Sequence, residues 1–336
     1  MKADRFMGIQ MKGSTMHVMA LDLGGTKLAA ALFDESGTMT HHQVQPLEKR
    51  QGKAVGGLIT DQIEQLLTKA TSQHIEINAI GISIPGIYYS KTGEVWAPNI
   101  PGWTEYPLLD QIKAMLQMKS IQVKIDSDRA CYILGETWQG AARGCQNAIF
   151  LAIGTGIGAG ILVDGQILRG HGDIAGAVGW MALDRSFQEG YRNCGCFEYH
   201  ASGEGLVRVA RSLITEDKDY SGLLRQKSID QITSHDIFAA YQQSDPIATA
   251  VLSEAIAYWG MAVANLVSIF NPEKIIFGGG VFGPAAQFLD QIKHEAERWA
   301  QPISMKQVSL EVSTLGGDAG LIGAGRLALM ALDKHF

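Results

Sequence analysis

The chain has 336 residues, of which 46% are hydrophobic, with 28 basic and 34 acidic side chains. This composition can supply a large core, and the length favours two domains over one. The net charge of −6 includes no block of like charges that could follow a phosphate backbone, so nucleic acid is not expected as a partner.

The N-terminal residues 1–16 include basic side chains but no continuous apolar stretch before a small-residue cleavage site, so no signal peptide is expected. No segment reaches the roughly 18 uninterrupted apolar residues that a membrane span needs. The four cysteines are too few and too unevenly spaced for a disulfide framework. A cytoplasmic protein without membrane contact is therefore expected.

Two glycine-rich segments repeat along the chain. LGGTKLAAALFD (23–34) aligns without gaps to IGTGIGAGILVD (153–164), at an offset of 130 residues. Each copy predicts a β-hairpin with glycines at its tip, where backbone N–H groups can approach an anion. A single copy is typical of a structural turn, whereas two copies predict a duplicated α/β architecture whose hairpins grip one polyphosphate. Neither copy has the spacing of a P-loop or of a dinucleotide-binding unit.

Strands and helices alternate along the rest of the chain, as in α/β proteins. Short buried strands are predicted at 79–86, 121–126 and 273–280. Helical patterns cover 53–74, 128–143, 203–215, 245–270, 283–299 and 319–332. The helix over 245–270 is expected to be buried and to begin near Ser244 or Asp245, with Pro246 in its first turn.

Two aspartates end predicted strands. Phosphates bound by such a turn repel a neighbouring carboxylate unless a cation lies between them. Asp22 is therefore expected to face Mg²⁺, directly or through water. Thr26 and Lys27 add a hydroxyl and a charge that phosphates need, and the alternative is that Asp22 only caps a turn. Asp128 either accepts a proton from a substrate hydroxyl or is a favourable first-turn charge in a helix capped by Asp126 or Ser127.

The order of these motifs resembles the ROK family of sugar kinases and sugar-responsive repressors, within the actin-like and hexokinase-like ATPases. The matching stretches are LDLGGTK (21–27), PG (85–86), APNIPGW (97–103), DSDRACYILGE (126–136), GTGIGAGI (154–161), AGAVGW (175–180), CFEYHASG (196–203), NPEKIIFGGGV (271–281) and LGGDAGLIGAG (315–325). The resemblance implies a two-lobed actin-like fold, a duplicated ribonuclease H-like arrangement. We expect an N-terminal α/β lobe over 16–124, completed by a C-terminal helix at 319–336, and a second α/β lobe over 125–318.

The resemblance also assigns roles to residues. It makes Asp128 the catalytic base, although Ser127 stands where the family usually has asparagine, and it makes Asn99 and Glu198 ligands of sugar hydroxyls. ATP with Mg²⁺ is the implied cofactor, and a homodimer is the common assembly. The implied nucleotide contacts are Asp22, Gly24, Gly25, Thr26 and Lys27 in the first hairpin, Gly154, Thr155 and Gly156 at the β- and γ-phosphates, and Gly278, Gly279 and Gly280 at the adenosine end.

The segment 175–203 departs from the family pattern. Relatives usually have AGEIGH, whose glutamate contacts the sugar and whose histidine contacts the sugar and ligates zinc, whereas this chain has Ala177 and Trp180 at these two positions. With the pattern anchored on Glu198, only Cys196 falls at one of the three family cysteine positions. Zinc needs four ligands, so we expect none.

The alternative for this loop is a displaced zinc site built from Cys194, Cys196, His200 and His171. Without zinc, we expect the loop to be held by packing of Phe197, Tyr191 and Trp180. Ala177 and Trp180 would alter the sugar site, either by stacking of the indole on the sugar or, for Trp180, by packing into the loop core.

The sequence therefore predicts an ATP-dependent sugar kinase that phosphorylates a hydroxyl, expected to be the 6-OH, of a hexose or hexose derivative. The alternative is a sugar sensor or pseudokinase of the same fold. A repressor is disfavoured because only 20 residues precede Leu21, and an NAD-linked enzyme is disfavoured by the topology of the glycine turns.

Overall fold

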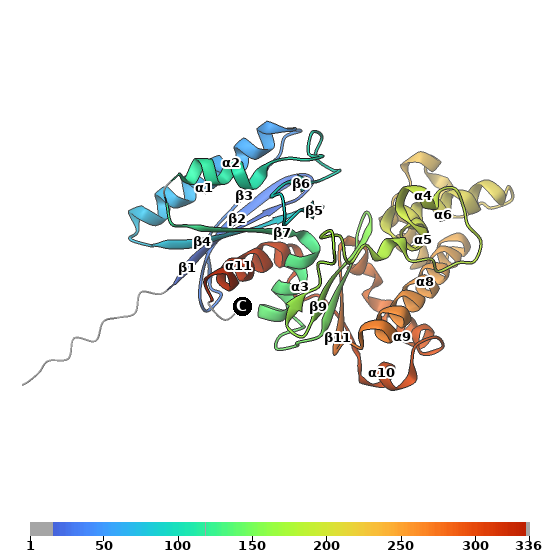
Figure 1. Cartoon of the computed structure of the whole chain (residues 1–336). Coiled ribbons are helices and arrows are strands. Elements are labelled where there is room, and N and C mark those ends of the chain that lie inside the picture. Colours follow the sequence, from blue (N-terminus) through green and yellow to red (C-terminus); the bar gives the residue numbers. More distant parts are fainter. Residues whose placement is uncertain (1–15, 118, 334–336) are drawn as a thin grey trace, which may run out of the picture.

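Two five-stranded sheets form the framework of the computed structural model, which describes residues 16–117 and 119–333 (Figure 1). The first sheet has the order β3 (Met39–Pro46), β2 (Lys27–Asp34), β1 (His17–Leu23), β4 (Ile77–Ile84), β7 (Gln122–Ser127). The second has the order β10 (Gln166–Ile167), β9 (Ile157–Val163), β8 (Ala148–Ile153), β11 (Lys274–Gly278), β12 (Ser309–Val312). In both sheets a meander of three antiparallel strands is followed by two parallel strands. The repeat in the sequence is therefore a repeat of topology.

Helices cover both faces of the first sheet. On one face, α1 (Lys53–Ser72) and α2 (Leu108–Leu116) pack against Met19 and Leu21 of β1. On the other face, Val18 and Ala20 pack against α11 (Ala319–Leu332). Because successive side chains of a strand point to opposite faces, one strand serves both layers.

The second sheet is covered in the same way. Its outer face packs against α6 (Gly203–Glu216), α8 (Pro246–Phe270) and α9 (Leu289–Glu297). Its inner face packs against α3 (Asp128–Gln139), which also contacts α11, so that α3 and α11 lie between the two sheets (Figure 1). The remaining strands and α-helices of the described residues are β5 (Ile87–Tyr88), β6 (Val95–Trp96), α4 (Tyr191–Cys194), α5 (Cys196–Ala201), α7 (Ser234–Tyr241) and α10 (Pro302–Gln307).

The predicted helices are all present, with some changes at their ends. α3 ends at Gln139, four residues before the expected 143, and the helix expected over 283–299 divides into a 3₁₀ turn at Pro284–Phe288 and α9. α8 begins as predicted, because Asp245 accepts hydrogen bonds from the N–H groups of Ile247 and Ala248. Among the described residues α8 is long and apolar enough to cross a membrane, but most of its apolar side chains are buried in the core of the second sheet.

The arrangement of the sheets bears on the division into lobes. β7 runs to Ser127 and pairs with β4, so the expected boundary after residue 124 falls inside this strand. α11 packs on β1 and β4 of the first sheet, and residues 334–336 of the expected helix lie outside the described residues. We therefore propose an N-terminal lobe built on the first sheet and α11, and a second lobe built on the second sheet.

Close contact between α3 and α11 depends on glycine. A Cβ added at Gly323 of α11 would collide with the carbonyl oxygen of Cys131 in α3. A Cβ at Gly135 of α3 would lie 2.7 Å from the carbonyl oxygen of Ala319. The backbones of the two helices therefore approach more closely than side chains would allow.

Replacing Gly323 by alanine should lower the free energy of unfolding by about 2 kcal/mol or more, because the added methyl group overpacks this contact. Gly57→Ala in α1 is the matched control, since a Cβ at Gly57 meets no atom within 4 Å. This control should stabilise the protein by about 0.5–1 kcal/mol through helix propensity. Urea unfolding measures both changes, and equal stability of the two variants would contradict the tight contact.

Candidate active site

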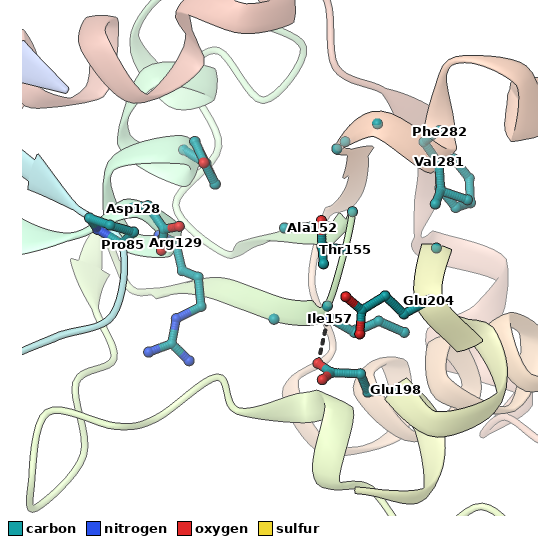
Figure 2. A pocket seen from close by; sticks show the side chains of 18 of the residues that line it. Pro85, Asp128, Arg129, Ala152, Thr155, Ile157, Glu198, Glu204, Val281 and Phe282 are labelled. Atoms are coloured by element: carbon teal, nitrogen blue, oxygen red, sulfur yellow. Dashed lines mark hydrogen bonds between the residues drawn. The ribbon is translucent and has the colours of Figure 1, made fainter. Parts of the chain in front are cut away.

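One cavity of about 1820 Å³ opens between the two sheets. Both glycine hairpins line it, together with the start of α3 and residues of α5, α6 and the loop after β11 (Figure 2). The predicted site residues on its wall are Asp22, Gly24, Gly25, Asn99, Asp128, Gly154, Thr155, Gly156, Ala177, Trp180, Glu198, Gly278, Gly279 and Gly280. Thr26 and Lys27 are exposed at the tip of the first hairpin and are not part of the wall.

The first hairpin places Asp22 beside a helix N-terminus. Gly24 closes the turn by donating its N–H to the carbonyl of Lys27 (2.9 Å). The carboxylate of Asp22 faces the first turn of α11, where a Cβ on Gly320 would lie 2.6 Å from both of its oxygens. Burial raises the pKa of Asp22 to about 6, and the nearby charge of Lys27 partly opposes this rise. The positive end of α11 favours the ionised form.

Asp128 enters the cavity from the junction of β7 and α3. Ser127 caps α3 by accepting a hydrogen bond from Ala130 N–H (3.3 Å), which decides between the two predicted caps. Asp128 Oδ1 accepts a hydrogen bond from Arg129 N–H (2.7 Å). Burial raises the pKa of Asp128 to about 6; the charge of Arg129 lowers it and the charge of Asp22 raises it. Two carboxyl groups that influence each other therefore face one cavity.

The second hairpin holds Glu198. The N–H of Ile157 donates to Glu198 Oε2 (2.6 Å), as Figure 2 shows. A Cβ on Gly156 would lie 2.7 Å from the same oxygen, so a side chain there would displace this carboxylate. Burial raises the pKa of Glu198. A backbone bond from a rigid hairpin thus orients this carboxylate at the cavity wall.

Glycines at the end of β11 form the opposite end of the cavity. Gly279 has a φ of 90°, in the region that favours glycine, and a Cβ on it would lie 2.5 Å from the carbonyl oxygen of Ile153 in the second hairpin. Gly316 and Gly317 line the same end. The glycines therefore expose backbone on a part of the wall that also carries the side chains of Val281 and Phe282.

Aromatic rings pack the loop that contains Cys194 and Cys196. Tyr191 and Phe197 are buried as expected, but Trp180 is 56% exposed and lines the cavity, so the expected packing of Trp180 into the loop was wrong. The ring of His200 stacks on Tyr258 with centroids 4.6 Å apart, and its Nε2 lies 2.8 Å from the hydroxyl of Tyr191. In the described part of the chain, no group of three or more His, Cys, Asp or Glu side chains is placed to hold a metal ion.

Known proteins share this architecture over nearly the whole chain. The model of the ROK family matches residues 18–331. The chain belongs to the ROK family. The expected family and the expected two-lobed fold are thereby confirmed.

Several known sugar kinases are similar to this chain over nearly its whole length. A glucokinase of Halalkalibacterium halodurans is 34% identical over 319 residues, covering 92% of this chain and 94% of the relative. The crystal structure of a ROK hexokinase from Thermus thermophilus matches with a TM-score of 0.77 and 27% identity, over 94% of this chain and 99% of the other. A ROK glucokinase from Streptomyces griseus, solved with glucose and AMPPNP, matches with a TM-score of 0.71 and 30% identity, over 94% and 99%.

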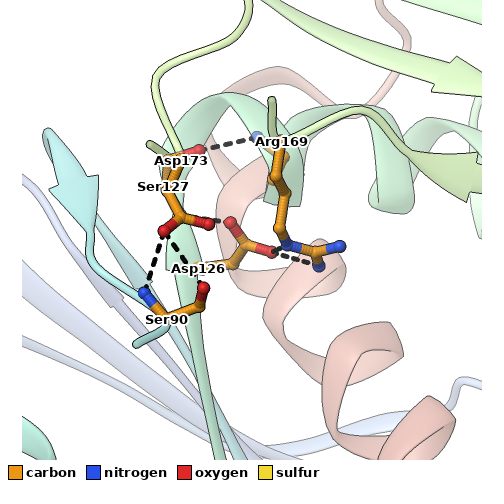
Figure 3. A network of polar contacts seen from close by, with 6 residues as sticks. Ser90, Asp126, Ser127, Arg169 and Asp173 are labelled. Atoms are coloured by element: carbon orange, nitrogen blue, oxygen red, sulfur yellow. Dashed lines mark hydrogen bonds and ion pairs between the residues drawn. The ribbon is translucent and has the colours of Figure 1, made fainter. Parts of the chain in front are cut away.

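A polar network attaches the loop that carries Ala177 to the first lobe (Figure 3). Arg169 donates to Asp126 Oδ2 through Nε (3.0 Å) and a terminal guanidinium nitrogen (2.5 Å). Asp173 Oδ2 accepts hydrogen bonds from the backbone N–H and the hydroxyl of Ser90, both at 3.0 Å. Asp126 is buried at the end of β7, two residues before Asp128. The network therefore links the loop after β10 to the strand that delivers Asp128.

Sequence reasoning missed Arg129, Arg169 and Asp173. Arg129 lies on the cavity wall, and its position directly after Asp128 was the available signal. Arg169 and Asp173 meet partners 43 and 83 residues away in sequence, so no local pattern points to them.

Replacing Arg169 by methionine should lower the free energy of unfolding by about 1–3 kcal/mol, because it leaves the buried carboxylate of Asp126 without its ion pair. The double variant Arg169→Met with Asp126→Asn should recover part of the loss, since the unpaired charge is then removed. Urea unfolding of both single variants and the double variant measures the coupling. A neutral effect of Arg169→Met would contradict a role for this pair.

Proposed function

We propose that the cavity binds ATP and a hexose or hexose derivative together and transfers the γ-phosphate to a sugar hydroxyl, the 6-OH in a hexose. The enzyme class, a sugar kinase, follows from ROK membership and from the full-length similarity to glucokinases. The observation that carries the proposal is the meeting of two glycine hairpins and two strand-end carboxylates on one cavity wall. The homodimer and the cytoplasmic location remain predictions.

ATP would lie between the hairpins. The tips at Gly24–Gly25 and Gly154–Gly156 leave backbone open for the phosphates, with Thr26 and Lys27 near the first tip, while Gly278–Gly280 would border the adenosine. The residues present also fit a magnesium ion, because buried carboxylate oxygens are ligands that Mg²⁺ prefers and Asp22 has a raised pKa that a nearby cation would lower. Asp22 would hold the ion directly or through water, and the ion would neutralise phosphate charge.

The sugar would occupy the acceptor half of the cavity, which we define by Asn99, Asp128, Ala177, Trp180 and Glu198. Asn99 and Glu198 would bind hydroxyl groups, and the exposed indole of Trp180 would pack against the C–H face of the ring. Asp128 accepts the proton of the attacking sugar hydroxyl while the oxygen of that hydroxyl forms a bond to the γ-phosphorus. The bond from that phosphorus to the β–γ bridging oxygen breaks in line, and ADP leaves.

Asp128→Asn should lower kcat by about 10²- to 10⁴-fold, the range for loss of a general base. The amide keeps the shape of the side chain, so thermal unfolding and sugar binding should change little. A coupled ADP-release assay with saturating ATP, Mg²⁺ and sugar measures the loss. Unchanged turnover would reject Asp128 as the base, and a wild-type protein that binds sugar without releasing ADP would be a sensor.

The pH profile should report the ionisation of Asp128. The base works only when ionised and burial raises its pKa to about 6, so kcat/KM for the sugar should fall as the pH drops through about 6 and level off above it. At saturating Mg²⁺ and ATP, Asp22 should not contribute to this limb, because a cation beside it would lower its pKa. Initial rates between pH 5 and 8 test this, with the coupling enzymes in excess at each pH. A rate that does not change between pH 7 and pH 5 would contradict it.

A further inference from the structure

Arg129 is held in a defined path across the second sheet. It follows Asp128 at the start of α3 and is half-buried. A Cβ on Gly158 would lie 2.6 Å from Arg129 Cδ, and one on Gly160 would collide with the carbonyl oxygen of Arg129. Two glycines of β9 therefore make room for this residue. Gly158 directly follows Ile157, whose N–H binds Glu198, so the side chain passes beside the acceptor half.

The guanidinium group of Arg129 forms no hydrogen bond or ion pair with a described residue, although its charge lowers the pKa of Asp128. Figure 2 shows it extending into the cavity from the position of Asp128, on the side of Glu198. Two other arginines of the wall are engaged: Arg208 donates to the carbonyl of Tyr199 (2.7 Å) and Arg211 to the carbonyl of Asp230 (2.8 Å). Guanidinium carries five donors and no acceptor. The donors of this half-buried group are therefore free to bind an oxyanion in the cavity.

The position of Arg129 indicates where that oxyanion would come from. Its side chain lies against Gly158, the residue after Ile157, whose N–H binds Glu198. The guanidinium group therefore lies on the side of the cavity that we assign to the acceptor sugar, where the carboxylates of Asp128 and Glu198 form no ion pair with it. We propose that Arg129 is a specificity-determining residue that binds an anionic substituent, a carboxylate or a phosphate ester, on the acceptor sugar. The inference rests on the proposed function, since it names the class of sugar that the same site takes.

Two matched pairs of probes test the proposal. N-acetylmuramic acid carries a carboxylate-bearing group that N-acetylglucosamine lacks. Glucose 1-phosphate has a phosphate where methyl glucoside has a methyl group. The first pair therefore tests for a carboxylate and the second for a phosphate ester. Binding is measured by calorimetry without ATP and turnover by ADP release. The variants are Arg129→Gln and Arg129→Lys, with Arg143→Gln, an exposed arginine off the cavity wall, as control.

The wild-type protein should prefer the anionic member of at least one pair. Arg129→Gln should weaken that binding by about 10- to 100-fold, the size of a charge-assisted hydrogen bond, and change binding of the neutral member by less than about threefold. Arg129→Lys should retain part of the preference, and Arg143→Gln should retain all of it. Thermal unfolding shows whether each variant is folded.

Equal binding within both pairs, or an equal loss for anionic and neutral sugars in Arg129→Gln, would overturn the proposal. Turnover of neutral sugars alone would leave the sugar-kinase function standing while rejecting the role of Arg129. Anion-selective binding without ADP release would support the role of Arg129 and count against the kinase reaction.

Discussion

The site depends on the glycine contact between α3 and α11. α3 begins at Asp128, and α11 begins beside the carboxylate of Asp22. Because Gly135 and Gly323 let the two backbones touch, the start of α3 places Asp128 in the same cavity as Asp22, which lies on β1 beside the start of α11. A side chain at either glycine would separate the helices and with them the two acids. The same pair of helices lies between the sheets, so the contact also fixes how the glycine hairpins face each other.

Electrostatics at this junction suit phosphoryl transfer. Burial raises the pKa values of Asp22 and Asp128 to about 6. The N-terminus of α11 beside Asp22 and the charge of Arg129 beside Asp128 partly oppose this rise. A base whose pKa lies just below neutral pH is ionised at pH 7 yet can still accept a proton. The Arg169–Asp126 pair adds a link from the loop after β10 to β7, the strand that ends directly before Asp128.

Local signals in the sequence predicted much of the framework, because hairpins and long helices are encoded by short patterns. The glycine repeat predicted both hairpins, and Pro246 after Asp245 predicted the start of α8. α2 was missed because it starts after Pro107 without a capping side chain, and α10 because its cap is the unusual Gln301. α7 was missed although Thr233 and Asp236 form a capping box, a signal that the sequence does contain. The exposure of Trp180 and the partners of Arg169 arise from tertiary contacts, which no local pattern encodes.

The most direct test of the account is ADP release by the wild-type protein from ATP and Mg²⁺, with and without each member of a broad panel of sugars, and phosphorus NMR of the products. The account predicts ADP release that depends on at least one sugar, with one phosphorylated sugar formed for each ADP. Sugar binding without any sugar-dependent ADP, or ADP without a phosphorylated sugar, would contradict it.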